Sequence, residues 1–146
     1  MEIYTDGSGL DGNIGCTFVV MQNSEIHQQG YRLSNFRSVF QAKLEAVNMA
    51  VGWSEQHLTH TQIAIFTDCQ SAINLINSRQ LHPISTAIKK LTLNSSNSYS
   101  ITWVRSHHGT TGNERADQLA KTAANNDTLD SIYNKISLNK VKTSIQ

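Results

Sequence analysis

The stretch IAIFTDCQSAINLINS, residues 63–78, carries the main signal for the fold. Residues 63–67 form a compact β run, and Asp68 follows it directly. The next residues have a helical period that places Ala72, Ile73 and Ile76 on one face. A buried strand that passes straight into a helix is typical of a crossover unit, in which the strands run parallel. The sequence therefore predicts at least one parallel pair of strands, with a carboxylate at the strand-to-helix turn.

The residues before this stretch predict a meander followed by a helix. Residues 1–33 alternate as strands do, and the glycine-rich segment DGSGLDGNIG, residues 6–15, predicts a turn between the first two strands. From about Ser38 the period becomes helical, with apolar residues spaced by four, three and four. This pattern predicts an amphipathic helix of about four turns, whose apolar stripe consists of Phe40, Leu44, Val47 and Val51.

The residues after it complete a mixed α/β pattern. Pro83 opens a further helix over residues 84–93, residues 99–104 alternate as a strand, and a helix is expected over residues 113–124. The order predicts a five-stranded mixed sheet, an antiparallel three-strand meander plus two crossover-connected parallel strands, flanked by helices. The periodicity weakens after that last helix, so we expect one domain over residues 1–125 and a tail or linker start over residues 126–146.

Composition limits the classes of protein to which the chain can belong. A chain of 146 residues allows one domain. Charged residues make up only 16%, which excludes a coiled coil and an acidic disordered tail, and the net charge of +1 provides no general attraction to polyanions. Cys16 and Cys69 form no metal-binding pair. No apolar run approaches the roughly 20 residues of a membrane span, so we expect an intracellular protein, cytoplasmic or nuclear.

Three aspartates occupy the ends of predicted elements. Asp6 ends the first strand, Asp68 ends the strand of the crossover unit, and Asp117 lies in the first turns of the last helix. The two strands are expected to be neighbours, which would place two carboxylates close together. Clustered carboxylates favour a divalent cation such as Mg²⁺ or Mn²⁺. Taken singly, Asp6 is also a good turn residue and Asp68 a good helix N-cap.

The residues around these aspartates resemble the ribonuclease H family. YTDGS at residues 4–8, FTDCQSAI at 66–73 and WVRSHHGTTGNERADQLAK at 103–121 are similar to its three aspartate-bearing motifs. The resemblance runs over residues 1–125. SVFQAKLEAV at 38–47 and TDCQSAI look most like the ribonuclease H domains of non-LTR retrotransposons, which form part of a larger reverse transcriptase polyprotein.

The resemblance implies an endonuclease that cuts the RNA strand of RNA/DNA hybrids with two Mg²⁺ (or Mn²⁺) ions. The ions would activate the attacking water and stabilise the leaving oxygen. By motif position Asp6, Asp68 and Asp117 would be metal ligands and catalytic residues, and His107 would assist proton transfer or product release. The expected partners are the hybrid and the reverse transcriptase domain of the same polyprotein, no membrane is expected, and the isolated domain is expected to be a monomer. The residues expected to bind substrate are Gly7, Ser8, Gln70, Arg105 and Asn113.

One position departs from the family pattern. The family reads Ala-Glu-aliphatic-any-Ala, with the Glu as a fourth metal ligand, whereas this chain reads Ala42-Lys43-Leu44-Glu45-Ala46. Glu45 is two positions along the helix from Lys43, a rotation of about 200°. It is therefore expected on the polar side of the helix and is a less suitable substitute for the missing ligand.

Lys43 leaves three interpretations open. Its ammonium could pair with Asp6 or Asp68 and take the place of a cation, which would leave a slow or inactive enzyme. It could instead extend to water, so that the three aspartates hold metal with reduced affinity. A third interpretation is an engineered lysine. The alternative function is thus a catalytically impaired or silent domain that serves structure or binding.

Three further features bear on function. An integrase or transposase of the DDE type could share the fold, but the run GNERAD at residues 112–117 and the short chain disfavour it. Residues 80–98 contain only two lysines, so the basic protrusion of cellular family members is expected to be missing and binding by the isolated domain to be weak and salt-sensitive. Trp53 and Trp103 are expected to pack in the core rather than to stack on bases.

Overall fold

The computed structural model describes residues 1–10, 12–34, 38–105 and 111–124. The tail predicted over residues 126–146 lies outside the described residues. Among the described helices, none has the length and apolar character needed to cross a membrane. The elements in chain order are β1 (Glu2–Leu10), β2 (Asn13–Gln22), β3 (Ser24–Leu33), α1 (Val39–His57), β4 (Gln62–Thr67), α2 (Gln70–Asn77), α3 (Pro83–Leu93), β5 (Ser98–Trp103) and α4 (Thr111–Ala124).

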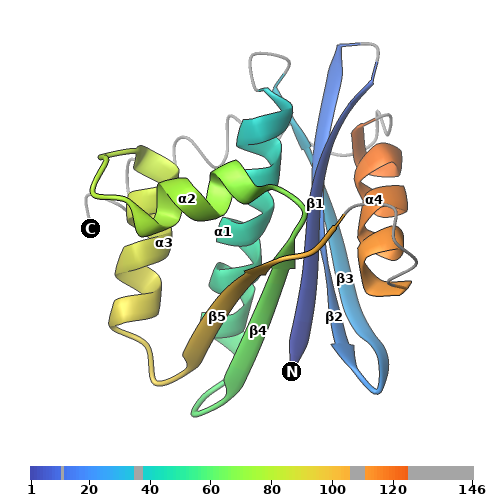
Figure 1. Ribbon diagram of the computed structural model, residues 1–146. Coiled ribbons are helices and arrows are strands. Elements are labelled where there is room, and N and C mark those ends of the chain that lie inside the picture. Colours follow the sequence, from blue (N-terminus) through green and yellow to red (C-terminus); the bar gives the residue numbers. More distant parts are fainter. Residues whose placement is uncertain (11, 35–37, 106–110, 125–146) are drawn as a thin grey trace.

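The strands form one mixed sheet that is covered by helices on both faces (Figure 1). Its order is β3-β2-β1-β4-β5, with β1 antiparallel to β2 and parallel to β4, and with β4 parallel to β5. Helix α1 packs on β1 and β2 together with α2 and α3, whereas α4 packs on β1, β2 and β3. The predicted five-stranded mixed sheet, with its meander and crossover-connected strands, is confirmed.

The glycine-rich segment is mostly strand, contrary to the turn predicted over residues 6–15. Strand β1 continues to Leu10 and pairs with β2 residue by residue, from Glu2 opposite Met21 to Leu10 opposite Asn13. The ladder hydrogen bonds with β2 outweigh the weak strand propensity of glycine. Among the glycines of this segment, Gly12, with a φ of 80°, has the left-handed conformation that favours glycine.

Glycines in β1 and β2 allow helices to approach the sheet closely. A Cβ added at Gly7 would lie 2.5 Å from the backbone nitrogen of Lys43, in α1. A Cβ added at Gly15 would lie 2.4 Å from the backbone nitrogen of Ala124, in α4. The two glycines therefore permit contact between helix and sheet on opposite faces, and the contact at Gly7 fixes the position of the first turns of α1.

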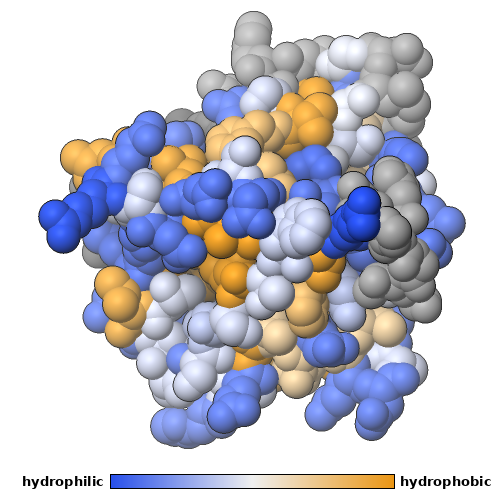
Figure 2. Space-filling view, viewed as in Figure 1, coloured by the Kyte–Doolittle hydropathy of each residue, from blue (hydrophilic) through white to orange (hydrophobic). Residues whose placement is uncertain are grey.

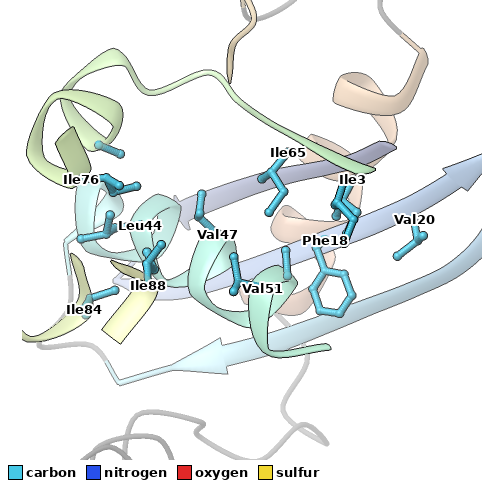
Figure 3. Packing of buried hydrophobic residues seen from close by; sticks show 13 residues of the cluster. Ile3, Phe18, Val20, Leu44, Val47, Val51, Ile65, Ile76, Ile84 and Ile88 are labelled. Carbon is cyan, nitrogen blue, oxygen red and sulfur yellow. The ribbon is translucent and has the colours of Figure 1, made fainter. Parts of the chain in front are cut away.

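The main hydrophobic core lies between the sheet and α1, α2 and α3 (Figure 3). The stripe predicted on the first helix is confirmed for Leu44, Val47 and Val51, which are fully buried, and Phe40 packs partly buried against them. Burial of one such aliphatic side chain stabilises the fold by about 1.5–3 kcal/mol. The residues labelled in the view are Ile3, Phe18, Val20, Leu44, Val47, Val51, Ile65, Ile76, Ile84 and Ile88.

One carboxylate ties the turn between α3 and β5 to α1. Oε2 of Glu55 accepts hydrogen bonds from the Ser95 hydroxyl at 2.5 Å, the Asn97 amide at 3.1 Å and the Tyr99 hydroxyl at 2.5 Å. Burial alone would raise the pKa of Glu55, but the three hydrogen bonds hold the pKa below its usual value. The turn is thus anchored near the end of α1 by a single charged oxygen, and we call this group of contacts the Glu55 anchor.

Candidate active site

Two aspartates meet where β1 and β4 end their pairing. Tyr4 stands opposite Phe66 in the parallel register, and Asp6 and Asp68 each lie two residues further along. The two rings stack with centroids 4.8 Å apart, and the Thr5 hydroxyl donates to the Phe66 carbonyl at 2.8 Å. Beyond this point the pairing of the two strands stops. The register therefore brings two carboxylates to the same point at the carboxyl edge of the sheet.

Lys43 lies between the two carboxylates. Its Nζ is 3.1 Å from Oδ1 of Asp6 and 2.7 Å from Oδ1 of Asp68. The side chain can reach them because Gly7 lets the first turns of α1 lie against β1. This arrangement matches the first of the three interpretations of the lysine, in which its ammonium pairs with the aspartates. We call Lys43, Asp6 and Asp68 the lysine–aspartate cluster.

The protonation of the cluster reflects one ammonium shared by two buried acids. Burial raises the pKa of Asp6 to about 7, the nearby Asp68 carboxylate adds to this rise, and Lys43 opposes it. Burial would lower the pKa of Lys43, but the two carboxylates outweigh burial and raise the pKa above its usual value. Lys43 therefore stays charged at neutral pH, while Asp6 exchanges its proton near neutrality.

The free energy of unfolding should depend on pH through the protonation of Asp6. The folded-state pKa of about 7 exceeds the ordinary value, so the folded state keeps a proton that the unfolded state loses. Asp6 should therefore make the free energy of unfolding fall as pH rises from about 4 to about 7. In urea unfolding with EDTA, we expect the unmodified protein to lose at least about 1 kcal/mol relative to Asp6→Asn between pH 5 and pH 7. Parallel pH profiles for the two proteins would contradict this assignment.

The third predicted aspartate pairs with a lysine on its own helix. Asp117 lies on the second turn of α4, and its Oδ2 is 3.0 Å from Nζ of Lys121 one turn further on. Across the part of the chain that the structure describes, no three His, Cys, Asp or Glu side chains are grouped so that they could hold a metal ion. The role of Asp117 as a metal ligand stays a prediction.

The cluster does not fit the pair of divalent ions that the resemblance implies. Carboxylate oxygens are suitable donors for Mg²⁺ or Mn²⁺. However, the ammonium of Lys43 contacts one oxygen of each carboxylate, in the space between Asp6 and Asp68. A metal ion at that position would have to displace the lysine.

The residues predicted to bind substrate differ in their accessibility. Gly7 is buried, and its amide donates to Oδ1 of Asp6 at 2.8 Å, so it holds the carboxylate in place. Ser8 is half-buried, whereas Arg105 is exposed. Gln70 is exposed and donates to Asn74 at 3.2 Å. His107 lies outside the described residues.

Asn113, also predicted to bind substrate, is buried. The residue is 2% exposed at the start of α4, and its Oδ1 has no hydrogen-bond partner among the residues that the structure describes. The adjacent Gly112 packs against the ring of Tyr4, where even a Cβ would lie 2.3 Å from the ring. The start of α4 is therefore packed directly on β1, at Tyr4, which is two residues before Asp6.

Glu45 is not on a polar, solvent-facing side of α1 as expected. It is fully buried, and its Oε1 accepts a hydrogen bond from the amide of Asn48 at 2.9 Å. The reason is that α1 is packed by β1, β2, β4, α2 and α3, so its buried arc is wider than one apolar stripe. None of the contacts described for Asp6 and Asp68 involves Glu45.

Trp103 was expected in the core but lies at the site. It is 46% exposed, and its indole N–H donates to the backbone carbonyl of Asp68 at 3.3 Å. Trp103 stands opposite Thr67 in the register of β5 and β4, so it ends its strand beside the turn that carries Asp68. Trp53 is partly buried against the core, with its ring stacked between His27 and His57.

The sequence analysis did not identify the aromatic residues and threonines that support Asp6 and Asp68, although they form a triplet that occurs twice in the sequence. Asp6 and Asp68 each follow an aromatic residue and a threonine, in Tyr4-Thr5-Asp6 and Phe66-Thr67-Asp68. Both threonines are fully buried, and the Thr67 hydroxyl accepts from the amide of Cys69 at 3.2 Å. The triplets align across the parallel pair, so the two rings stack on each other, while the Thr5 hydroxyl donates to the Phe66 carbonyl and the Thr67 hydroxyl holds the turn that carries Asp68.

Comparisons with known proteins show the family of the chain and proteins to which it is similar. The RNase H family profile matches residues 1–125 of the chain. The chain is 29% identical to the ribonuclease H of Klebsiella pneumoniae over 152 residues, covering 90% of this chain and 94% of that protein. It superposes on the crystal structure of RNase H1 from the archaeon Halobacterium salinarum with a TM-score of 0.69, at 19% identity, covering 84% of this chain and 95% of that one. The structural likeness supports the fold alone.

Proposed function

The chain belongs to the ribonuclease H family, and on this premise we propose that it hydrolyses the RNA strand of RNA/DNA hybrids. The observation that carries the proposal is the meeting of Asp6 and Asp68 where the pairing of the parallel strands β1 and β4 stops, within reach of one common cation. Both carboxylates are held in place, Asp6 by the Gly7 amide and the turn of Asp68 by Trp103. Two carboxylates held at one point could bind a divalent ion, which would activate water for hydrolysis of a phosphodiester.

We expect hydrolysis to be slow. Divalent ions, where a family member holds them, supply an activated water and stabilise the leaving oxygen. In this chain the ammonium of Lys43 must leave Asp6 and Asp68 before the carboxylates can serve another cation. Asp117 and His107 are proposed to complete the site from α4 and from the segment before it.

The proposed substrate is recognised through short polar groups. An RNA/DNA hybrid differs from DNA in its 2′-hydroxyls and groove shape, which side chains such as Ser8 and Gln70 can contact without a large positive charge. Figure 2 shows hydrophilic and apolar residues mixed over one face of the molecule, rather than one continuous apolar surface. With a net charge of +1, the isolated domain should bind weakly and in a salt-sensitive way.

The natural context that we propose is the polyprotein of a non-LTR retrotransposon. The motifs SVFQAKLEAV at residues 38–47 and TDCQSAI at 67–73 support this assignment. A reverse transcriptase domain on the same chain would raise the effective concentration of the hybrid at a weak site. Efficient cleavage would then not require tight binding by this domain alone.

Hybrid cleavage provides the direct test. A hybrid with a labelled RNA strand, incubated with the domain and Mn²⁺, should yield RNA fragments, whereas the same RNA as a single strand should stay intact. We expect Asp68→Asn to lower the rate at least about 100-fold, a loss of about 2.7 kcal/mol in transition-state stabilisation. Glu2→Gln is the matched control, because it removes one carboxylate at the exposed start of β1. The proposal fails if Asp68→Asn cleaves as fast as this control.

A second candidate function is a catalytically silent domain that binds hybrids. The double ion pair of Lys43 favours it, because the ammonium already satisfies the two carboxylates. In that case no RNA fragments would appear with any divalent ion, although the hybrid would still be bound.

A further inference from the structure

The exposed part of the lysine–aspartate cluster is its cation. The side chain of Lys43 is 20% exposed, whereas the side chains of Asp6 and Asp68 are 2% and 7% exposed. A ligand that approaches from solvent therefore meets the ammonium before it meets either carboxylate.

The ammonium also keeps one donor available. A lysine ammonium has three N–H donors, and Lys43 directs them at two acceptors, Oδ1 of Asp6 and Oδ1 of Asp68. No third acceptor for it is found among the described residues. One N–H is left for an oxygen of an incoming group, and a phosphate oxygen is a strong acceptor for a charged donor.

The formal charge of the cluster differs from that of the family pattern. Two carboxylates and one ammonium sum to a formal charge of −1, whereas a glutamate in place of Lys43 would give −3. Such a trianionic site would repel a phosphodiester strongly unless cations were present. With Lys43 the repulsion is smaller, and the nearest charge to the ligand is positive.

We propose that this site holds a backbone phosphate of the RNA/DNA hybrid without a divalent ion, with the Lys43 ammonium as its ligand. The inference rests on the proposed function for the identity of the nucleic acid, but it concerns binding and not cleavage. Hybrid binding by this chain is therefore independent of Mg²⁺, and the lysine that slows hydrolysis retains the substrate.

The test measures binding of a fluorescein-labelled 20-base-pair hybrid by anisotropy, in EDTA and in Mg²⁺ at one ionic strength. Measurements on ice, with the RNA checked on a gel, keep the hybrid intact in Mg²⁺. We expect the unmodified domain to bind with dissociation constants within 3-fold in the two buffers. Lys43→Glu should bind at least 10-fold more weakly in EDTA and recover in Mg²⁺, and Lys43→Met should lie between the two proteins.

Lys90→Glu is the matched control for net charge. It changes the net charge by −2, as Lys43→Glu does, but on an exposed residue of α3, so it should weaken binding by less than 3-fold. Equal losses for Lys43→Glu and Lys90→Glu would overturn the inference, because they would show a general effect of charge. If the unmodified domain bound the hybrid only in Mg²⁺, the inference would be overturned but the proposed function would not. Absence of hybrid binding by every variant in both buffers would overturn the inference and the proposed function together.

Discussion

Lys43→Glu should raise the rate of RNA cleavage in Mg²⁺ about 100-fold or more. The substitution removes the ammonium that lies 3.1 Å from Asp6 and 2.7 Å from Asp68 and places a third carboxylate beside them. Three clustered oxygen ligands favour a divalent cation far more than two carboxylates that are already paired. A 100-fold gain corresponds to about 2.7 kcal/mol of transition-state stabilisation. The measurement is the initial rate of cleavage of a labelled hybrid under single-turnover conditions.

Two controls separate the possible causes of this gain. Lys43→Met removes the positive charge without adding a ligand, so it should give a much smaller gain. Lys43→Glu combined with Asp68→Asn should return the rate to background, because the new carboxylate needs its neighbour. A rate for Lys43→Glu no higher than that of Lys43→Met would show that the lysine is not what limits the site.

Gly7→Ala should destabilise the fold by about 3 kcal/mol or more, at the upper end of overpacking effects. The added Cβ would lie 2.5 Å from the backbone nitrogen of Lys43 and 2.6 Å from the backbone carbon of Ala42. Backbone atoms cannot rotate away as a side chain can, so α1 would have to move off β1. The free energy of unfolding in urea is the measurement.

Gly52→Ala is the control for the effect of glycine replacement itself. A Cβ at Gly52 meets no atom within 4 Å, and the residue lies inside α1. Alanine there should stabilise the helix by about 0.5–1 kcal/mol. If Gly7→Ala proved as harmless as Gly52→Ala, the close contact between α1 and β1 would be wrong.

Local sequence was sufficient to predict the architecture and the meeting of two acids. The pattern of residues 63–78 indicated a strand that passes into a helix, and the neighbourhood of β1 and β4 then followed from topology. The contact of Lys43 with the aspartates was one of three open interpretations. Pairing with the aspartates and extension to water are distinguished only by the packing of α1 against Gly7, which depends on the tertiary structure.

The wrong expectations share a physical cause. The structure at each of these positions is set by residues that are distant in the sequence. Residues 6–10 are strand because β2 supplies their hydrogen bonds, which outweighs the glycine-rich composition. Glu45 is buried because α1 is covered on more than one side. Trp103 is exposed because its strand ends beside Asp68, at the edge of the sheet. Periodicity along one segment contains no information on any of these neighbours.

The Glu55 anchor has a practical consequence for the choice of insertion sites in this protein. A loop, tag or reporter inserted between Ser95 and Asn97 would pull apart donors that share one oxygen and would loosen the end of α1. The connection between α2 and α3 is a better place, since Leu81 there is 89% exposed. Grafting experiments on this scaffold should therefore open the chain at Leu81 and leave the α3–β5 turn untouched.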